Sequence, residues 1–260
     1  MIYYKTSEEI EGIRKSCLLV SRTLAEVAKI IRPGTSTLKI DKLVEEFIRD
    51  HGAIPSFLGY RDFPNAACVS VNDAVVHGIP ANYELKEGDI VSVDCGATLG
   101  GYVGDSAFTF AVGEISDDKR RLLEVTRESL NKAIEAAKVG NRLGDISYAV
   151  QEHVERNGYS VVRELVGHGV GKSLHEDPEV PNYGKRGHGL KLQDGLVIAI
   201  EPMVNMGRKE VFTADDNWTV YTRDRKPSAH FEHTVAVRKS GPDVLTTFKF
   251  IEEEVFGMAV

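Results

Sequence analysis

The feature that most constrains this chain is an internal repeat that places acidic residues at matching positions in two halves of the sequence. Residues 85–94 and 192–201 each begin with Leu, carry Gly three residues later, continue as an apolar run and end in a carboxylate. A second apolar run with another acid follows each segment. The four acids are Asp94, Asp105, Glu201 and Glu232. Because carboxylates that meet in a fold repel one another, a duplicated fold that gathers them predicts a centre for a pair of metal ions.

The helical segments repeat as well. Thr6 and Glu9 form a capping box, and apolar residues then recur at helical spacing as far as Ile31. Further helices are predicted at about 37–51, 117–138 and 144–157. Gly34 follows the first of these four helices, and Gly140 follows the third, 106 residues later. The helices therefore form two pairs, one in each half.

Strand-rich stretches follow each helix pair. They lie near 66–72, 89–95, 102–112, 161–167, 196–205 and 230–238. No linker rich in Pro, Gly and Ser divides the chain. We therefore predict an α+β architecture in which a pseudo-twofold antiparallel sheet is backed by the two helix pairs. The prediction is a single domain over residues 1–260, with pseudo-symmetric halves at roughly 1–112 and 113–250.

Asp94 and Asp105 flank a segment rich in turn-forming residues, centred on residues 99–100, which predicts a β-hairpin. In a hairpin that is symmetric about this centre, the two aspartates lie directly opposite one another, with Cβ atoms roughly 4.5–5.5 Å apart. They then need a cation between them. A pair of solvated strand acids is the alternative for this segment alone.

Glu201 interrupts the apolar run 196–204, where burial of a carboxylate is costly unless it is paired or binds a metal. Glu201 and Glu232 are also symmetric about a second turn signal at 216–217, so a longer hairpin can pair them. Because Pro202 follows, a glutamate at a plain strand end is the alternative. The repeat favours the convergent arrangement.

His168 lies in the glycine-rich segment 167–171. Flanking glycines allow backbone and ligands to approach closely, and imidazole is a common ligand of first-row transition metals. A structural histidine at a strand end is the alternative. The segment is not a phosphate-binding loop, because that motif needs Gly where Val166 stands, five residues before Gly171.

Composition excludes several classes of protein. The net charge of −7 gives no overall electrostatic reason to bind nucleic acid, and no apolar run approaches the length that spans a membrane. The first residues are too polar for the core of a signal peptide. Three isolated cysteines without a Cys-x-x-Cys pair argue against a disulfide framework and a thiolate zinc site. We therefore expect a cytoplasmic protein, and nothing in the sequence indicates more than a monomer.

Seven short motifs follow one another along the chain. They are Asn72-Asp-Ala-Val-Val-His-Gly-Ile-Pro80, Asp94-Cys-Gly-Ala, Gly104-Asp-Ser-Ala, Gly167-His-Gly-Val-Gly, Leu174-His-Glu-Asp-Pro, Ile200-Glu-Pro-Met and Phe231-Glu-His-Thr. Together, in this order and spacing, they resemble the type I methionine aminopeptidases, in their compact bacterial form, over nearly the whole chain. The resemblance implies the pita-bread (creatinase/aminopeptidase) fold, whose pseudo-twofold symmetry agrees with the repeat.

By position, the resemblance implies a binuclear metal centre. Asp105 and Glu232 would bridge two divalent ions. His168 and Glu201 would complete one site, and Asp94 would hold the other ion. Oxygen-rich ligation with one imidazole suits Mn(II), Fe(II), Co(II) or Zn(II).

The activity that the resemblance implies is removal of the initiator methionine from nascent proteins whose second residue is small, by attack of metal-activated water. Glu201 would accept the proton, His175 would stabilise the developing oxyanion, and His77 would contact the scissile amide. The implied partners are nascent polypeptide N-termini, with transient proximity to the ribosome, and no sequence-specific nucleic acid.

The methionine side chain needs an apolar slot that accepts an unbranched thioether. The resemblance implies that this slot is lined by Tyr60, Phe63, Cys68, His77, Leu174 and Trp218, with Phe57 adjacent. Phe63 stands where Tyr is familiar and Leu174 where Phe is common, which leaves the fit of the slot open. A structural monovalent cation is implied near Asn72 and Ser228.

Two other readings share the fold. A prolidase or aminopeptidase P has the same five ligands, but these enzymes carry a substantial extra N-terminal domain, and only one helix and a short arm precede the second helix here. A non-catalytic adaptor would bind ribosomes or RNA, but such relatives lose metal ligands that this chain keeps. We therefore expect the aminopeptidase.

Overall fold

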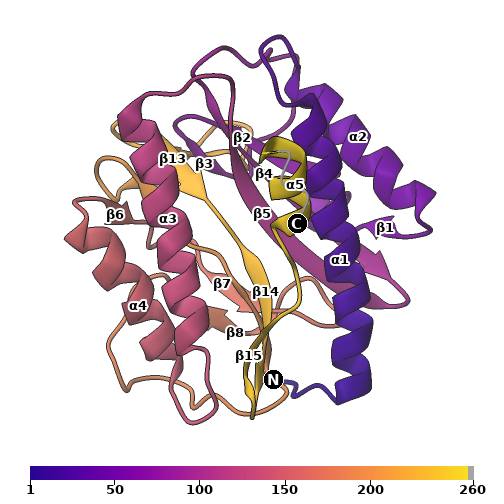
Figure 1. Cartoon of the computed structure of the whole chain (residues 1–260), viewed down its shortest axis with the longest axis vertical. Helices are drawn as coiled ribbons and strands as arrows, with labels where there is room; N and C mark the ends of the chain where they lie inside the picture. Colours follow the sequence, from indigo (N-terminus) through magenta and orange to yellow (C-terminus); the bar gives the residue numbers. More distant parts are fainter. Residues whose placement is uncertain (257–260) are drawn as a thin grey trace.

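Two helix pairs lie over one face of the strands (Figure 1). The structure is a computed structural model and describes residues 1–256. The helices are α1 Ser7–Ile30, α2 Thr37–Asp50, α3 Asp117–Ala136, α4 Leu143–Arg156 and the short α5 Lys249–Phe256. The first four agree with the predicted helices to within two residues, and α5 was not predicted. α1 begins at the predicted capping box, in which the side chains of Thr6 and Glu9 each accept a hydrogen bond from the other's backbone nitrogen.

The first half forms an antiparallel sheet around one central strand. Its strands are β1 Ile54–Pro55, β2 Ala67–Val71, β4 Ile90–Leu99 and β5 Tyr102–Ala111. β4 pairs with β5 along one edge and with β2 and β1 along the other. α1 packs directly on this sheet. Its backbone comes so close to β5 that a Cβ atom on Gly104 would lie 2.3 Å from the backbone nitrogen of Cys17. Glycine at this position therefore allows the helix backbone to touch β5.

The second half is organised by one long hairpin whose register stays constant. Its outgoing strands are β9 Val197–Ile200, β10 Met203–Asn205 and β11 Val211–Thr213, and its returning strands are β12 Val220–Thr222, β13 Ser228–His230 and β14 His233–Arg238. Ile200 pairs with His233 at one end, and Thr213 pairs with Val220 at the other. Strand pairing lapses at 201–202 and 231–232, which divides the predicted stretches 196–205 and 230–238.

Five further strands complete the structure around this hairpin. They are β3 Ala74–Val76, β6 Ser160–Val161, β7 Gly167–Gly169, β8 Glu176–Val180 and β15 Gly241–Val244. The largest sheet has the order β15-β14-β9-β7-β8, while β6 pairs with β10 and β3 pairs with β12. The predicted strand at 161–167 is therefore wrong over most of its length. This segment crosses from the edge strand β6 of one sheet to the interior strand β7 of another, so only its two ends pair.

The two halves are joined along β5 by hydrogen bonds. The Ser106 hydroxyl donates to the carbonyl of Glu232 (2.7 Å), and the backbone nitrogen of Glu232 donates to the carbonyl of Ala107 (3.0 Å). The Thr234 hydroxyl donates to the carbonyl of Asp105 (2.8 Å). These contacts place an acidic residue of one half beside an acidic residue of the other.

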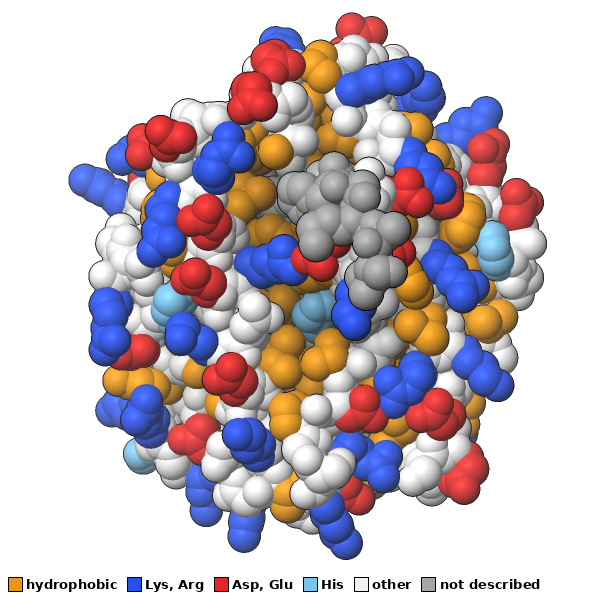
Figure 2. Space-filling view, in the orientation of Figure 1, with side chains coloured by type: hydrophobic (Ala, Val, Ile, Leu, Met, Phe, Trp, Pro, Cys, Tyr) orange, Lys and Arg blue, Asp and Glu red, His pale blue; other side chains and the backbone are white. Residues whose placement is uncertain are grey.

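The surface that carries the helices shows basic and acidic side chains interspersed, without a large area of one sign (Figure 2). Beneath the helices, the main apolar cluster fills the space between them and the strands. Among residues 1–256, no helix combines the length and the apolar character needed to cross a lipid bilayer.

Candidate metal centre

Asp94 and Asp105 lie on the β4–β5 hairpin, but they are not directly opposite one another. Asp94 pairs with Ala107, and Asp105 pairs with Gly96. The expected register is wrong by two residues, because the turn consists of the glycines at 100–101, which adopt positive φ angles of 60° and 82°. Since side chains alternate with a period of two, this difference leaves both carboxylates on one face, as diagonal neighbours.

Glu201 and Glu232 occupy matching positions on the long hairpin, as its predicted symmetry requires. Glu201 follows Ile200 and Glu232 precedes His233, and these two neighbours are the pair that ends the β9–β14 ladder. The gap in the ladder frees the backbone here. The main-chain carbonyl of Glu201, for example, accepts from the side-chain nitrogen of Asn182 (3.0 Å).

His168 on β7 presents one ring nitrogen to the acids. Its Nδ1 lies 2.9 Å from the carbonyl oxygen of Gly169, which can only accept, so Nδ1 carries the proton. Its Nε2 lies 3.7 Å from Asp105 Oδ2 and 3.6 Å from Glu201 Oε1. Burial lowers the pKa of His168 to about 4, so the ring is neutral and Nε2 is free to bind a metal.

Glycine is required on both sides of His168. A Cβ atom on Gly167 would lie 2.4 Å from the carbonyl oxygen of Ala199, and one on Gly169 would lie 2.3 Å from that of Asp177. β7 is thus held closely between β9 and β8. The interpretation of these glycines as positions where backbone approaches closely is confirmed.

The four carboxylates are held together without a basic partner. Burial raises the pKa of Asp94 to about 8 and raises the pKa values of Asp105, Glu201 and Glu232 well above their usual range. Negative charge on Asp94 and Glu201 adds to the effect of burial on the pKa of Asp105. No lysine or arginine among residues 1–256 forms an ion pair with any of the four.

Several oxygens in this cluster have no hydrogen-bond partner within the part of the chain that the structure describes. They are Asp94 Oδ1, Asp105 Oδ1 and Glu232 Oε1. Burial of a carboxylate oxygen that accepts no hydrogen bond is costly, unless the oxygen contacts a cation or coordinates a metal. Asp105, His168 and Glu232 each offer a ligand atom within 4.8 Å of the others. This donor set fits a divalent cation, and Asp94 and Glu201 line the same cavity.

Two more predicted histidines lie at the same cavity. The ring of His175 stacks on Tyr60, with centroids 5.1 Å apart, and its centroid lies 4.0 Å from that of His168. His77 has a positive φ of 57° and meets the edge of Trp218 at 6.2 Å. Burial lowers the pKa of His77, so it is neutral at pH 7. No sequence pattern indicated this strained backbone conformation at His77.

The structure brings all thirteen predicted site residues to one cavity of about 250 Å³. One wall carries the acids and histidines. The other wall is apolar and aromatic, with Phe63 and Trp218 in an edge-to-face contact at 5.1 Å. The predicted apolar residues on this cavity are Phe57, Tyr60, Phe63, Cys68, Leu174 and Trp218. Burial also raises the pKa of the Cys68 thiol well above its usual value.

Sequence reasoning missed several residues that contact the cavity or its acids. Those lining it are Arg61, Val76, Glu164, Leu165, Val166 and Met203. His230 was also missed, although it is 1% exposed, has no partner on either ring nitrogen and lies 3.8 Å from Glu201 Oε2. Its position two residues before Glu232 on an extended segment was the available signal, because such residues share a face.

A model of metallopeptidase family M24 matches residues 11–239. The chain belongs to metallopeptidase family M24. As an M24 protein it is a metal-dependent hydrolase, and the cluster of carboxylates and imidazole described above supplies residues that fit a divalent cation.

Other M24 proteins align over nearly the whole chain. The chain is 53% identical over 249 residues to a methionine aminopeptidase of Clostridium perfringens, covering 96% of this chain and 100% of the relative. It is 54% identical over 246 residues to methionine aminopeptidase 1 of Bacillus subtilis, covering 95% and 99%.

Solved M24 structures give the same result for the fold. The methionine aminopeptidase from Thermotoga maritima superposes with a TM-score of 0.93 at 47% identity, covering 95% of this chain and 100% of that chain. A prolidase from Pyrococcus horikoshii, at 24% identity and a TM-score of 0.76, shares the fold, and the match covers 63% of its length. The predicted α+β pita-bread fold is confirmed.

Proposed function

We propose that this chain is a methionine aminopeptidase that removes the initiator methionine from nascent proteins whose second residue is small. The observation that carries the proposal is the cavity itself, in which four acids without a basic partner face an apolar, aromatic wall. The names of the relatives at 53% and 54% identity support the same substrate.

The proposed cofactor is a pair of divalent ions. Asp105 and Glu232 would bridge them, His168 and Glu201 would complete one site, and Asp94 would hold the second ion. When bound, such ions lower the pKa of water and so supply a nucleophile at neutral pH. Mn(II), Fe(II), Co(II) and Zn(II) all suit this donor set.

Side chains of the cavity would bind the substrate and move its protons. Glu201 would accept the proton of the attacking water, because its carboxylate lines the cavity beside the residues that would hold the ions. His175 would donate a hydrogen bond to the oxyanion that develops. His77, which is neutral, would donate to the nitrogen of the scissile amide and help it leave.

The apolar wall would hold the methionine side chain. Tyr60, Phe63, Cys68, Leu174 and Trp218 lie on it, with His77 at its edge and Phe57 adjacent. An unbranched thioether fills such irregular aromatic surfaces well, because its sulfur makes favourable contacts with rings. Phe63 and Leu174, the two unusual residues, both keep this surface apolar.

The wider setting is part of the proposal. We infer one catalytic domain over 1–260, with halves at roughly 1–112 and 113–250, because both halves supply acids. The partners would be nascent N-termini, with transient proximity to the ribosome in the cytoplasm. A monovalent cation near Asn72 and Ser228 would depend on backbone oxygens, since the side-chain oxygen of Asn72 already accepts from Lys119 Nζ (2.9 Å) and the Ile90 nitrogen (3.2 Å).

The test is a comparison of substrates with and without metal. Purified protein is stripped with a chelator, dialysed and supplied with Mn(II), Fe(II), Co(II) or Zn(II). We expect cleavage of Met-Ala-Ser that depends on metal, and no cleavage of X-Pro peptides. Cleavage of X-Pro peptides alone would favour the prolidase alternative. Equal or absent activity in stripped and replete samples would favour the adaptor.

A further inference from the structure

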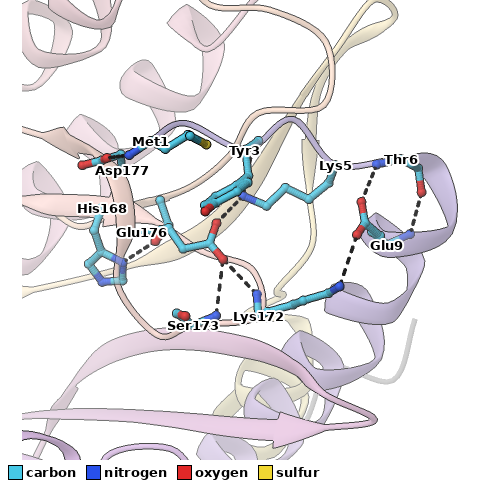
Figure 3. Close-up of polar contacts among 11 residues, drawn as sticks. Met1, Tyr3, Lys5, Thr6, Glu9, His168, Lys172, Ser173, Glu176 and Asp177 are labelled. Carbon is cyan, nitrogen blue, oxygen red and sulfur yellow. Dashed lines mark hydrogen bonds and ion pairs between the residues drawn. The ribbon is translucent and has the colours of Figure 1, made fainter.

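The N-terminal arm, residues 1–6, lies along the start of β8 and the turn that precedes it (Figure 3). The amino group of Met1 forms an ion pair with Asp177, and Ile2 forms a β-bridge with the same residue. Further along the arm, the backbone nitrogen of Lys5 donates to the carbonyl of Gly195 (2.7 Å). The arm is therefore attached at both ends to the second half of the chain.

Lys5 forms a buried ion pair at the end of this arm. Its Nζ lies 2.6 Å from Glu176 Oε2, and the two side chains are only 5% and 9% exposed. By contrast, the long-range pair between Arg14 and Asp243 has side chains that are 26% and 36% exposed. Burial strengthens the attraction between Lys5 and Glu176, and it makes loss of either partner costly.

Glu176 connects this ion pair to the turn at 171–176. Its Oε1 accepts hydrogen bonds from the backbone nitrogens of Lys172 (2.9 Å) and Ser173 (3.3 Å), while Oε2 binds Lys5 (Figure 3). A Cβ atom on Gly171 would lie 2.4 Å from Glu176 Oε1, so the carboxylate is packed tightly into the turn. Oε1 of Glu176 thus closes the turn, and Oε2 attaches the turn to Lys5 on the arm.

His175 directly precedes Glu176, so the turn determines where its ring lies. The ring rests between Tyr60 and His168, at centroid distances of 5.1 and 4.0 Å. We propose that Lys5 is a positioning residue, which holds His175 at the cavity through Glu176 without touching the substrate. This inference rests on the proposed role of His175 in turnover. A small misplacement of such a group is enough to lower the rate strongly.

The test is a double-mutant cycle between Lys5 and His175. Activity on Met-Ala-Ser is measured with saturating Mn(II) for wild type, Lys5→Met, His175→Ala and the double variant. We expect Lys5→Met to lower kcat about tenfold or more, with KM changed less than about threefold, because the misplaced group acts in the transition state. In the His175→Ala background, the same change should lower kcat less than about twofold. Lys5→Arg should restore part of the loss.

A second readout does not depend on activity. Hydrogen exchange of a peptide that covers 171–176 should be faster in Lys5→Met and Glu176→Gln than in wild type, and Arg14→Met, the matched control, should leave it unchanged. If Lys5→Met unfolds the protein, the carboxylate of Glu176 that it leaves unpaired is the cause to remove. The Lys5→Met/Glu176→Gln double variant does so and then takes the place of Lys5→Met in the cycle.

Three results would overturn the inference. They are an unchanged kcat in Lys5→Met, an equal loss of kcat with and without His175, and unchanged exchange at 171–176. A wild type that is inactive on Met-Ala-Ser but shows the expected exchange pattern would contradict the proposed function while leaving the mechanical link from Lys5 to the turn intact.

Discussion

At Asp105, the proposed metal binding and the stability of the metal-free fold make opposite demands. It is 3% exposed, and the charges of Asp94 and Glu201 act on it. We expect Asp105→Asn to raise the Tm of the chelated protein, because one repelling charge is removed. The same variant should lose the increase in Tm that divalent metal produces. Thermal unfolding with a chelator and with Mn(II) measures both effects, and full metal-dependent activity in this variant would contradict the bridging role.

Asp41 is the matched control for Asp105. It is also buried, but its carboxylate accepts from the backbone nitrogens of Ala66 (2.8 Å) and Ala67 (3.0 Å) and from the side chain of Asn65 (2.7 Å). Asp41→Asn should therefore lower stability by about 1–3 kcal/mol, because a hydrogen-bonded charge is lost. Its response to Mn(II) should equal that of wild type.

Substitution of His175 should lower turnover without changing metal binding. Its side chain stacks on Tyr60 and does not belong to the group of ligand atoms formed by Asp105, His168 and Glu232. We expect His175→Ala to keep the metal content of wild type, measured by elemental analysis, and to lose about 10²–10³-fold in kcat, the usual cost of removing one donor to an oxyanion. Loss of bound metal in this variant would instead assign His175 to the ligands.

Among the elements, α1 and β5 approach each other so closely that their contact needs glycine. A Cβ atom at Gly104 would lie 2.4 Å from the carbonyl carbon of Ser16 and 2.3 Å from the nitrogen of Cys17, both backbone atoms. Gly104→Ala should therefore push the helix from the sheet and lower the free energy of unfolding by about 3 kcal/mol, as overpacking does. Urea unfolding measures this, and a change below about 0.5 kcal/mol would show that the helix can shift freely.

Asp145, in the first turn of α4, should make the free energy of unfolding depend on pH. Asp145 accepts from the backbone nitrogens of Arg142 (2.7 Å) and Gly187 (2.8 Å), and these two hydrogen bonds lower its pKa. Because the folded pKa is below the unfolded value of about 3.9, the ionised carboxylate stabilises the fold above that value, and the effect is lost as pH falls through the folded pKa. Asp145→Asn should cost about 1 kcal/mol at pH 7.

The pH series supplies the check on this prediction. Urea unfolding of wild type and Asp145→Asn should give curves whose difference is constant from pH 7 to about pH 5 and narrows as the pH falls below about 4. If the difference in the free energy of unfolding between the two proteins grew as the pH fell, the Asp145 carboxylate would not be the source of the stabilisation.

The two hairpins show what the sequence could predict about elements. The long hairpin was placed correctly, because its ladder keeps one register from Ile200 to Thr213 and its centre at 216–217 carries a recognisable turn signal. The pairing register of the first hairpin was predicted wrongly by two residues, because glycines near its centre allow more than one turn. Only the positive φ of Gly100 and Gly101 together selects the observed one.

The strands that the sequence missed are mostly edges. β8, for example, reads Glu-Asp-Pro-Glu-Val and lacks the apolar alternation of a strand. It is extended because β7 pairs with it and because the N-terminal arm bridges to Asp177. Its conformation comes from tertiary contacts, which local sequence patterns do not contain.

For the whole molecule, the cavity could be anticipated only because recognisable motifs mark its residues. The acids come from β4, β5 and the two arms of the long hairpin, which no local pattern brings together. Arg61 and Met203 were missed because their side chains reach the cavity only through the packing of separate segments. The resemblance therefore supplied what periodicity alone could not, and the diagonal arrangement of the aspartates still required the structure.

Metal should stabilise the whole fold. The ions would bind the folded cavity and not the unfolded chain, so metal at a hundred times its dissociation constant adds about 2.7 kcal/mol. For a chain of this size we expect a rise in Tm of roughly 5–10 °C between chelated and Mn(II)-loaded protein. Scanning calorimetry of both forms measures it. Identical Tm values, with metal demonstrably absent from one sample, would contradict a centre buried in the fold.

The division of the acids between the two halves has a consequence for synthesis. As a polypeptide leaves the ribosome, the β4–β5 hairpin with Asp94 and Asp105 is made long before Glu232 on the returning arm. Until that arm has bonded to β5, the two aspartates would lack the residues with which they are proposed to hold an ion. A newly made copy of this protein would therefore gain the proposed metal centre, and the proposed activity on other nascent chains, only after its own late strand has folded back.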